Sequence, residues 1–227
     1  MLEILKDEFA FLKSLPQTKT IRYNRGSIFQ KVAIVLCFYV LLDFLISMSI
    51  GYSLDTLFPE IEEAYSLDIE IDFGGIFLIV FLLPFFEELI FRLPLKLSKL
   101  RLSIFLFLLA ANTFLINFYV GFGTLLILGI SLNFFFSKKY FKLIKSKWLR
   151  YKVEVFYFFT FVFGLVHVSN FDPQILPWYI FPIVFLPQLI GGFLTGIVRL
   201  RFGFFYGLLF HSVFNGIISI LEYYTES

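Results

Sequence analysis

Long apolar runs alternate with short polar segments along most of the chain. The runs cover about residues 28–50, 73–97, 102–118, 124–136, 153–169, 178–198 and 204–221. Most of them approach the 20 or so residues that a helix needs to cross a bilayer. The pattern therefore predicts an all-α fold, a polytopic transmembrane helical bundle of about seven spans. Pro182, Pro187 and the Gly191-Gly192 pair predict a bent sixth span, and Pro94 a kink or an end in the second.

The polar segments divide the chain further. Leu2, Leu5, Phe9 and Leu12 recur at helical spacing, so residues 1–27 are expected to form a cytoplasmic amphipathic segment. Residues 28–221 are interpreted as a single transmembrane domain whose site-bearing part is 70–220. Residues 222–227 would form a short outer tail. Residues 119–123 are expected to form a tight uncharged turn between the third and fourth spans.

The basic residues indicate an orientation. All 19 Lys and Arg residues fall within 1–31, 92–101, 138–152 and 199–201. With seven spans, these four segments lie on one side of the membrane. Basic residues concentrate in cytoplasmic loops, so the N-terminus is expected inside and the C-terminus outside.

Composition agrees with an integral membrane protein. The chain is 59% hydrophobic and 16% charged, whereas soluble domains have about 25% charged residues. One cysteine, Cys37, leaves no intrachain disulfide. Nothing indicates nucleic-acid binding, because the basic segment 138–152 suits an inner loop or a contact with anionic lipid. The bilayer is thus an expected partner, while the oligomeric state stays open.

Two adjacent carboxylates and an arginine, Glu87, Glu88 and Arg92, lie inside the apolar part of the second span. A charged group at such depth is by default a functional hypothesis. Glu88 and Arg92 are four residues apart and can pair on one helix face. Glu87 lies about 100° around the helix and is the carboxylate left for general-base chemistry. A structural ion network and the proton relay of a carrier are the alternatives.

The only two histidines, His167 and His211, both lie in expected spans. Phe163 precedes His167 by one turn and could pack against its imidazole. His211 and Asn215 share a helix face and could donate two hydrogen bonds to a developing oxyanion. Alternatively, His167 is a hydrogen-bonded packing residue, and His211 with Asn215 forms a polar clamp between helices.

In this order, Glu87-Glu88-x-x-x-Arg92, Phe163-x-x-x-His167 and His211-x-x-x-Asn215 resemble the three motifs of a known family. It is the CAAX protease and bacteriocin-processing (CPBP, or Abi) family, which includes the Ras-converting CAAX endopeptidases. The resemblance covers about residues 70–220. It implies an intramembrane endopeptidase in which Glu87 and His167 activate a water, and His211 and Asn215 stabilise the oxyanion. Glu88 and Arg92 would orient their helix.

The resemblance also implies a substrate and a setting. The substrate would be a peptide or a membrane-associated protein, in bacteriocin or peptide maturation or in self-immunity. Small size and a Phe-, Ile- and Lys-rich composition favour the plasma membrane of a bacterium. No cofactor is expected. Zinc, held by Glu87, His167 and His211, is the less favoured alternative, because no His-Glu-x-x-His pair is present and Glu88 alone would remain as a base.

Two other classes of function stay open. One is a non-catalytic membrane partner or immunity protein that binds another membrane protein and keeps these motifs for packing. The other is a proton-coupled carrier, against which no inverted repeat is evident. Asp43, the one charge inside the first span, receives no role.

Overall fold

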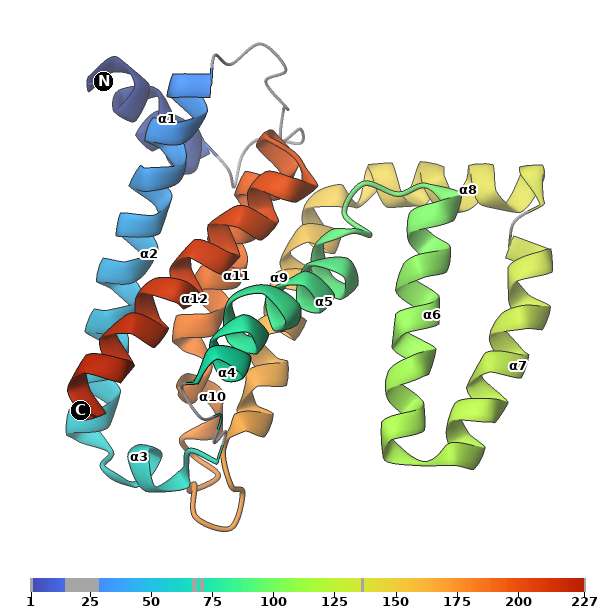
Figure 1. Cartoon of the computed structure of the whole chain (residues 1–227). Coiled ribbons are helices and arrows are strands. Elements are labelled where there is room, and N and C mark those ends of the chain that lie inside the picture. The colour runs from blue at the N-terminus through green and yellow to red at the C-terminus, as the bar shows by residue number, and fades with distance from the viewer. Residues whose placement is uncertain (1, 15–28, 67–68, 70–71, 136, 227) are drawn as a thin grey trace. The chain divides into compact units, whose positions relative to one another are not determined.

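The computed structural model describes residues 2–14, 29–66, 69, 72–135 and 137–226. Every regular element in these ranges is a helix (Figure 1). Within these ranges, five helices are long and apolar enough to cross a membrane: Lys31–Leu57, Phe73–Arg92, Lys152–Asn170, Phe181–Arg201 and Phe204–Tyr224. These features support an all-α membrane protein, while seven spans and their orientation stay predictions. Residues 15–27, from the expected N-terminal segment, lie outside the described ranges.

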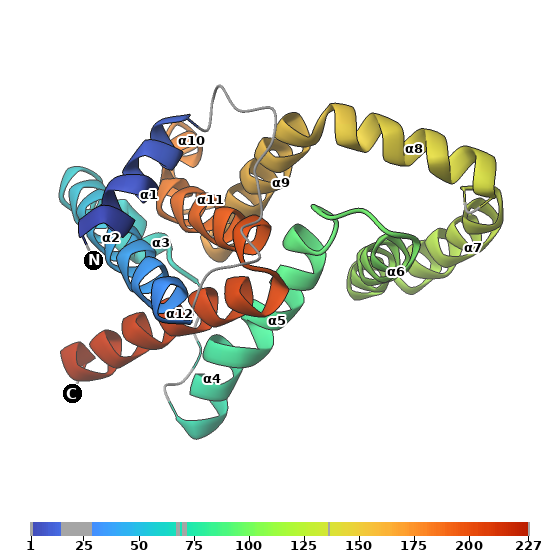
Figure 2. The ribbon, with the colours of Figure 1, turned by 90° about the horizontal axis from the view of Figure 1, so that it is seen from above.

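The helices gather into two compact units, one of Met1–Phe85 with Tyr157–Ser227 and the other of Phe86–Phe156. The first unit holds α1 (Leu2–Ser14), α2 (Phe29–Leu57), α3 (Glu60–Ala64), α4 (Phe73–Phe77), η1 (Leu78–Leu82), most of α9 (Lys152–Val166), η3 (His167–Asn170), α10 (Phe181–Val184), α11 (Leu186–Arg201) and α12 (Phe204–Glu226). In it, α11 packs along both α2 and α12, and α12 also contacts α2 and η1 (Figure 2).

The expected bend in the sixth span is a break in the helix. The chain leaves α10 at Val184 and enters α11 at Leu186, with Phe185 between them. Pro182 and Pro187 each lie in the first turn of their helix. Proline is accepted there because the first amide groups of a helix have no partner within it.

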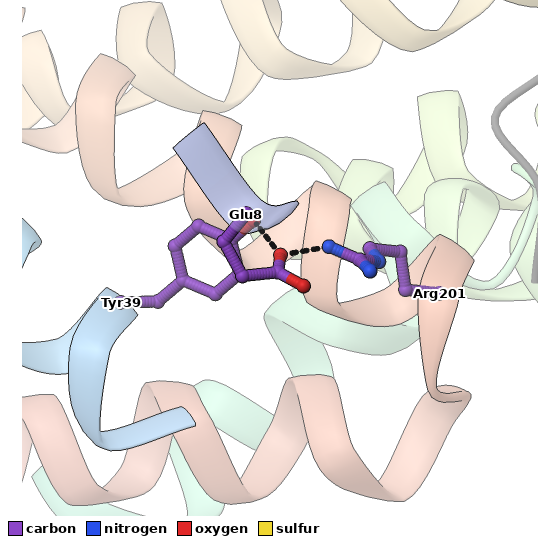
Figure 3. A network of polar contacts seen from close by, with 3 residues as sticks. All are labelled: Glu8, Tyr39 and Arg201. Atoms are coloured by element: carbon purple, nitrogen blue, oxygen red, sulfur yellow. Dashed lines mark hydrogen bonds and ion pairs between the residues drawn. The ribbon is translucent and has the colours of Figure 1, made fainter. Parts of the chain in front are cut away.

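A buried ion pair joins α1 to the rest of the first unit. The amphipathic helix that the sequence predicts is present over Leu2–Ser14, yet its Glu8 is only 3% exposed. Figure 3 shows the Glu8 carboxylate between Tyr39 and Arg201. Tyr39 Oη donates to Glu8 Oε2 over 2.9 Å, and Arg201 Nη1 donates to the same oxygen. The Arg201 guanidinium also lies 4.2 Å from the centroid of the Phe11 ring. Glu8 therefore links α1 to α2 and α11.

Replacing Glu8 by glutamine is expected to lower the free energy of unfolding by about 2 kcal/mol, because a buried charge-assisted bond to Arg201 is lost. Asp7→Asn is the matched control, since Asp7 is the exposed neighbour on the same helix. It should change stability by no more than about 0.5 kcal/mol. Unfolding in detergent micelles measures both variants. Equal stability of the two would show that Glu8 does not anchor α1.

At one end of the first unit, α3 packs against the segment that follows η3. Leu54, Ile61 and Ala64 form a buried cluster with Phe171, Leu176, Ile180 and Val184. Backbone bonds join the same segments: Ser66 N–H donates to Asn170 O over 2.8 Å, and Asp172 N–H donates to Ala64 O over 2.7 Å. The short helix η3, which carries His167, is thereby held in place.

The second unit contains η2 (Glu88–Arg92), α6 (Lys99–Ile116), α7 (Phe118–Phe135) and α8 (Lys138–Arg150). Helices α6 and α7 pack against each other as a hairpin. The prediction of a turn at residues 119–123 is wrong. The chain turns at Asn117, and residues 119–123 lie inside α7. Asn117 Oδ1 accepts from the Tyr119 amide over 2.9 Å, so its side chain caps α7 and the glycines beyond it lie inside the helix.

The helix with the acidic motif contains two π-helical turns, η1 and η2, separated by α5 (Leu83–Glu87). Leu83 N–H donates to Leu78 O, and Leu93 N–H to Glu88 O, each across five residues. Each turn ends two residues before a proline, Pro84 or Pro94. A proline has no N–H and its ring clashes with the carbonyl four residues earlier. A wider turn relieves that clash, and such turns are frequent at functional sites.

Candidate functional site

Both histidines of the chain lie against one phenylalanine ring in the first unit. The Phe163 ring centroid is 4.7 Å from that of His167 and 5.9 Å from that of His211. Phe163 is 4% exposed, so the contact lies inside the bundle. The expected packing of Phe163 on His167 is confirmed, and η3 and α12 bring both imidazoles against the same ring.

A backbone hydrogen bond orients His167. Its Nδ1 lies 2.8 Å from Phe163 O. A carbonyl oxygen can only accept, so Nδ1 carries the proton and donates it. In the neutral ring, Nε2 then carries the lone pair, as a base or a ligand requires. His167 is also the first residue of η3, at the point where α9 ends.

Asn215 completes the hydrogen bonding of the neighbouring helix. Its Nδ2 donates to Ile79 O over 3.0 Å. In η1, Leu83 N–H donates to Leu78 O rather than to Ile79 O, and Pro84 has no N–H to offer. The Ile79 carbonyl thus lacks its usual backbone donor, and Asn215 supplies one from α12. One N–H of the amide is used in this clamp, and the amide carries a second.

Asn215→Leu is expected to lower the free energy of unfolding by about 1–3 kcal/mol, because the Ile79 carbonyl loses its donor in an apolar setting. In a Pro84→Ala background the same substitution should have a smaller effect, since residue 84 then offers an N–H to the helix. Thermal unfolding of the four proteins of this cycle measures the coupling between the two positions. Strictly additive effects would contradict the account of the clamp.

The acidic motif lies in the second unit. Glu88 and Arg92 are 0% and 1% exposed, and Arg92 Nε lies 3.6 Å from Glu88 Oε1. The ion pair expected from their spacing is therefore present. Glu87 is half-buried and ends α5 where the π-helical turn begins. The wider turn changes the angular relation of these side chains from that of a regular α-helix.

Asp43 is a candidate that the sequence reasoning left without a role. It lies in α2 and is 1% exposed. Ser47 Oγ donates to its Oδ1 over 2.9 Å. The feature of the sequence that marks Asp43 as a candidate is its position as a single carboxylate inside an apolar span.

An apolar groove of about 420 Å³ lies between the α4–η1–α5 segment and α12 in the first unit. Its lining residues are Phe77, Phe81, Leu82, Phe85, Phe205, Leu208, Leu209 and Ser212. Ser212 is the one polar side chain among them and follows His211 in α12. The groove therefore reaches the residue that follows His211 in α12.

Among the described residues, no group of three His, Cys, Asp or Glu side chains is placed to hold a metal ion. Comparison with known proteins found no matching family model, no matching curated protein and no matching solved structure.

Proposed function

We propose that this chain is an intramembrane endopeptidase of the CPBP type, which hydrolyses a peptide bond in a membrane-associated peptide or protein. The observation that carries the proposal is the shared contact of His167 and His211 with the Phe163 ring. Three residues from two of the motifs, Phe163, His167 and His211, thus meet in the first unit. Asn215 lies one turn after His211 on the same helix.

In the proposed reaction, Glu87 is the general base and His167 its partner in holding the attacking water. The water oxygen adds to the scissile carbonyl carbon while its proton passes to Glu87. His211 and the second N–H of Asn215 donate to the developing oxyanion. Glu87 then returns the proton to the leaving amine as the C–N bond breaks. The pairing of Glu87 with His167 rests on the order of the motifs in the sequence, and the reaction needs no cofactor.

We infer a seven-span topology with the N-terminus in the cytoplasm of a bacterial cell. Support comes from the placement of all 19 Lys and Arg residues in the four segments of one side. The basic helix α8 would then lie at the inner surface, with its half-buried Phe141, Ile144 and Trp148 on one face.

The apolar groove suits the substrate of such an enzyme. A peptide already in the bilayer presents apolar side chains, which the Phe- and Leu-lined wall would accept. Ser212 is the one polar residue that lines the groove. The specificity for substrate would therefore come from shape and apolar contact.

One observation favours the alternative of a non-catalytic membrane partner. The Asn215–Ile79 bond is the polar clamp between helices that a packing role predicts. A packing role needs the shape of each motif residue but not the basicity of a carboxylate.

Comparative proteomics of membrane fractions distinguishes the peptidase from the non-catalytic membrane partner. Cells of the native host would carry the wild type, Glu87→Gln or His167→Gln at matched expression. Hydrolysis predicts that one precursor accumulates in both variants and that its cleaved product disappears. A membrane partner predicts unchanged peptide termini in all three strains, which would refute the proposal.

A further inference from the structure

The charges of the second unit are strongly segregated. Residues 86–156 contain eleven Lys and Arg residues and three Glu residues. Between Glu88 and Glu154 the sequence has no acidic residue. The basic residues fall in two stretches, 92–101 up to the start of α6 and 138–152 along α8 into the start of α9. Such a concentration of one sign beside apolar helices attracts a partner of the opposite charge.

Helix α8 carries most of these basic residues and is amphipathic. At about 100° per residue, Phe141, Ile144 and Trp148 share one face, and all three are half-buried. The six Lys and Arg side chains of α8 are exposed. Figure 1 shows α8 running crosswise to α6 and α7. An apolar face with exposed lysines at its edges is typical of a helix that lies in the headgroup region of a bilayer.

Lys99, at the start of α6, reaches α8 at Phe141. Its Nζ lies 5.6 Å from the centroid of the Phe141 ring. Lys138 precedes Phe141 by three residues and Lys145 follows it by four, so both lie on the side of α8 that carries this ring. The first turns of α6 and α8 contain no acidic residue. Like charges three or four residues apart on a helix, such as Lys142 and Lys145, repel each other. An anion bound beside them would offset this repulsion.

We propose that the lysine cluster of Lys99, Lys138 and Lys145 at the Phe141 ring binds the phosphate of an anionic phospholipid. Lysine ammonium groups bind phosphate oxygens as point charges, and clusters of basic residues next to a membrane span recognise anionic lipids. The ring of Phe141 gives the lipid an apolar contact beside its phosphate. The site depends neither on peptide hydrolysis nor on the side of the membrane that α8 faces.

The depth of α8 favours a lipid over a free phosphate or a soluble acidic protein. One residue, Tyr151, separates α8 from α9. The apolar segment Lys152–Asn170, which is long enough to cross a membrane, begins directly after it. This short connection keeps α8 at the level where a span ends, which is where lipid headgroups lie.

Tryptophan fluorescence in phosphatidylcholine nanodiscs tests the site. Trp178→Phe leaves Trp148 as the one tryptophan of the chain, on the same side of α8 as Phe141 and about two turns along. Phosphatidylglycerol or phosphatidylcholine with brominated acyl chains is added in increasing fraction, and bromine quenches an indole that it contacts. Half-maximal quenching is expected at a mole fraction about tenfold lower for phosphatidylglycerol, because each lysine near an anionic surface contributes about fivefold in binding.

Lys99→Gln combined with Lys145→Gln is expected to reduce this preference to about twofold or less, since two of the three charges are lost. Lys139→Gln combined with Arg150→Gln is the matched control, because it removes two basic residues from the face of α8 opposite Phe141. The preference of the control should stay within about twofold of the wild type. All four replaced side chains are exposed, and glutamine suits a helix as well as lysine does, so both double variants should fold.

Equal quenching by the two lipids in the wild type would overturn the proposal, as would a preference that survives the loss of Lys99 and Lys145. An equal loss of preference in both double variants would show a diffuse charge effect and overturn the site. Inorganic phosphate, compared with chloride at equal ionic strength, should leave the lipid bound, and release of the lipid would reassign the site to a free anion. A Trp148 that neither lipid quenches would show that protein covers this face, which would also overturn the proposal.

Discussion

Replacing Glu87 by glutamine is expected to lower kcat for peptide hydrolysis by about 1,000-fold, with no comparable loss of stability. Glutamine keeps the shape of the side chain but cannot take a proton from water, and a positioned general base contributes about 10²–10⁴-fold. Glu87 is half-buried at the end of α5, and the buried pair of Glu88 with Arg92 stays in place in this variant. The cleavage rate of purified protein in nanodiscs measures the effect.

Glu88→Gln is the matched control for Glu87→Gln. Glu88 is fully buried and paired with Arg92. Removing one partner of a buried pair leaves the other charge uncompensated, which destabilises by about 3–5 kcal/mol. The control should therefore reduce the yield of folded protein. If Glu87→Gln retained wild-type kcat, or if the two variants lost folded protein alike, Glu87 would not be the base.

Gly164→Ala is expected to lower the free energy of unfolding by about 2–3 kcal/mol through overpacking between α9 and α11. A Cβ at Gly164 would lie 3.0 Å from Phe185 Cδ2 and 3.1 Å from Leu189 Cα. The second of these is backbone, which cannot yield without moving α11. Small residues allow such close approach of membrane helices. Displacement of α9 would also move His167, so activity should fall as well.

Gly216→Ala controls for the loss of a glycine from a helix. A Cβ there would lie 3.8 Å from Val80 Cγ1, an ordinary contact. The expected change in stability is neutral or slightly favourable, because alanine favours helix over glycine. Unfolding in detergent measures the stability of the Gly164→Ala and Gly216→Ala proteins. A Gly164→Ala protein as stable as the Gly216→Ala protein would contradict the close packing of α9 on α11.

Local patterns in the sequence predicted the elements and several contacts. Apolar run length predicted the five helices that are long enough to cross a membrane, and Pro182 with Pro187 predicted the break at Phe185. Spacing of four residues predicted the Glu88–Arg92 pair and the packing of Phe163 on His167. These features depend on residues within one or two helical turns, where periodicity is informative.

Features that depend on distant residues or on irregular backbone were not predictable in the same way. The amphipathic N-terminal helix was expected, but the burial of Glu8 depends on Arg201 from the other end of the chain. The role of Asn215 toward Ile79 depends on a π-helical turn, whose signal is a proline two residues beyond it. The turn expected at 119–123 lies instead at Asn117, where the asparagine side chain accepts from the Tyr119 amide and begins α7.

Hydrolysis in water enriched in oxygen-18 tests the central claim most directly. Purified wild-type protein in nanodiscs would be incubated with the precursor that accumulates in the Glu87→Gln strain. We expect one oxygen-18 atom in the carboxylate of each new C-terminus, because the attacking oxygen comes from water, and almost no product with Glu87→Gln or His167→Gln. Product formed by those variants at the wild-type rate, or no cleavage by the wild type, would contradict the account.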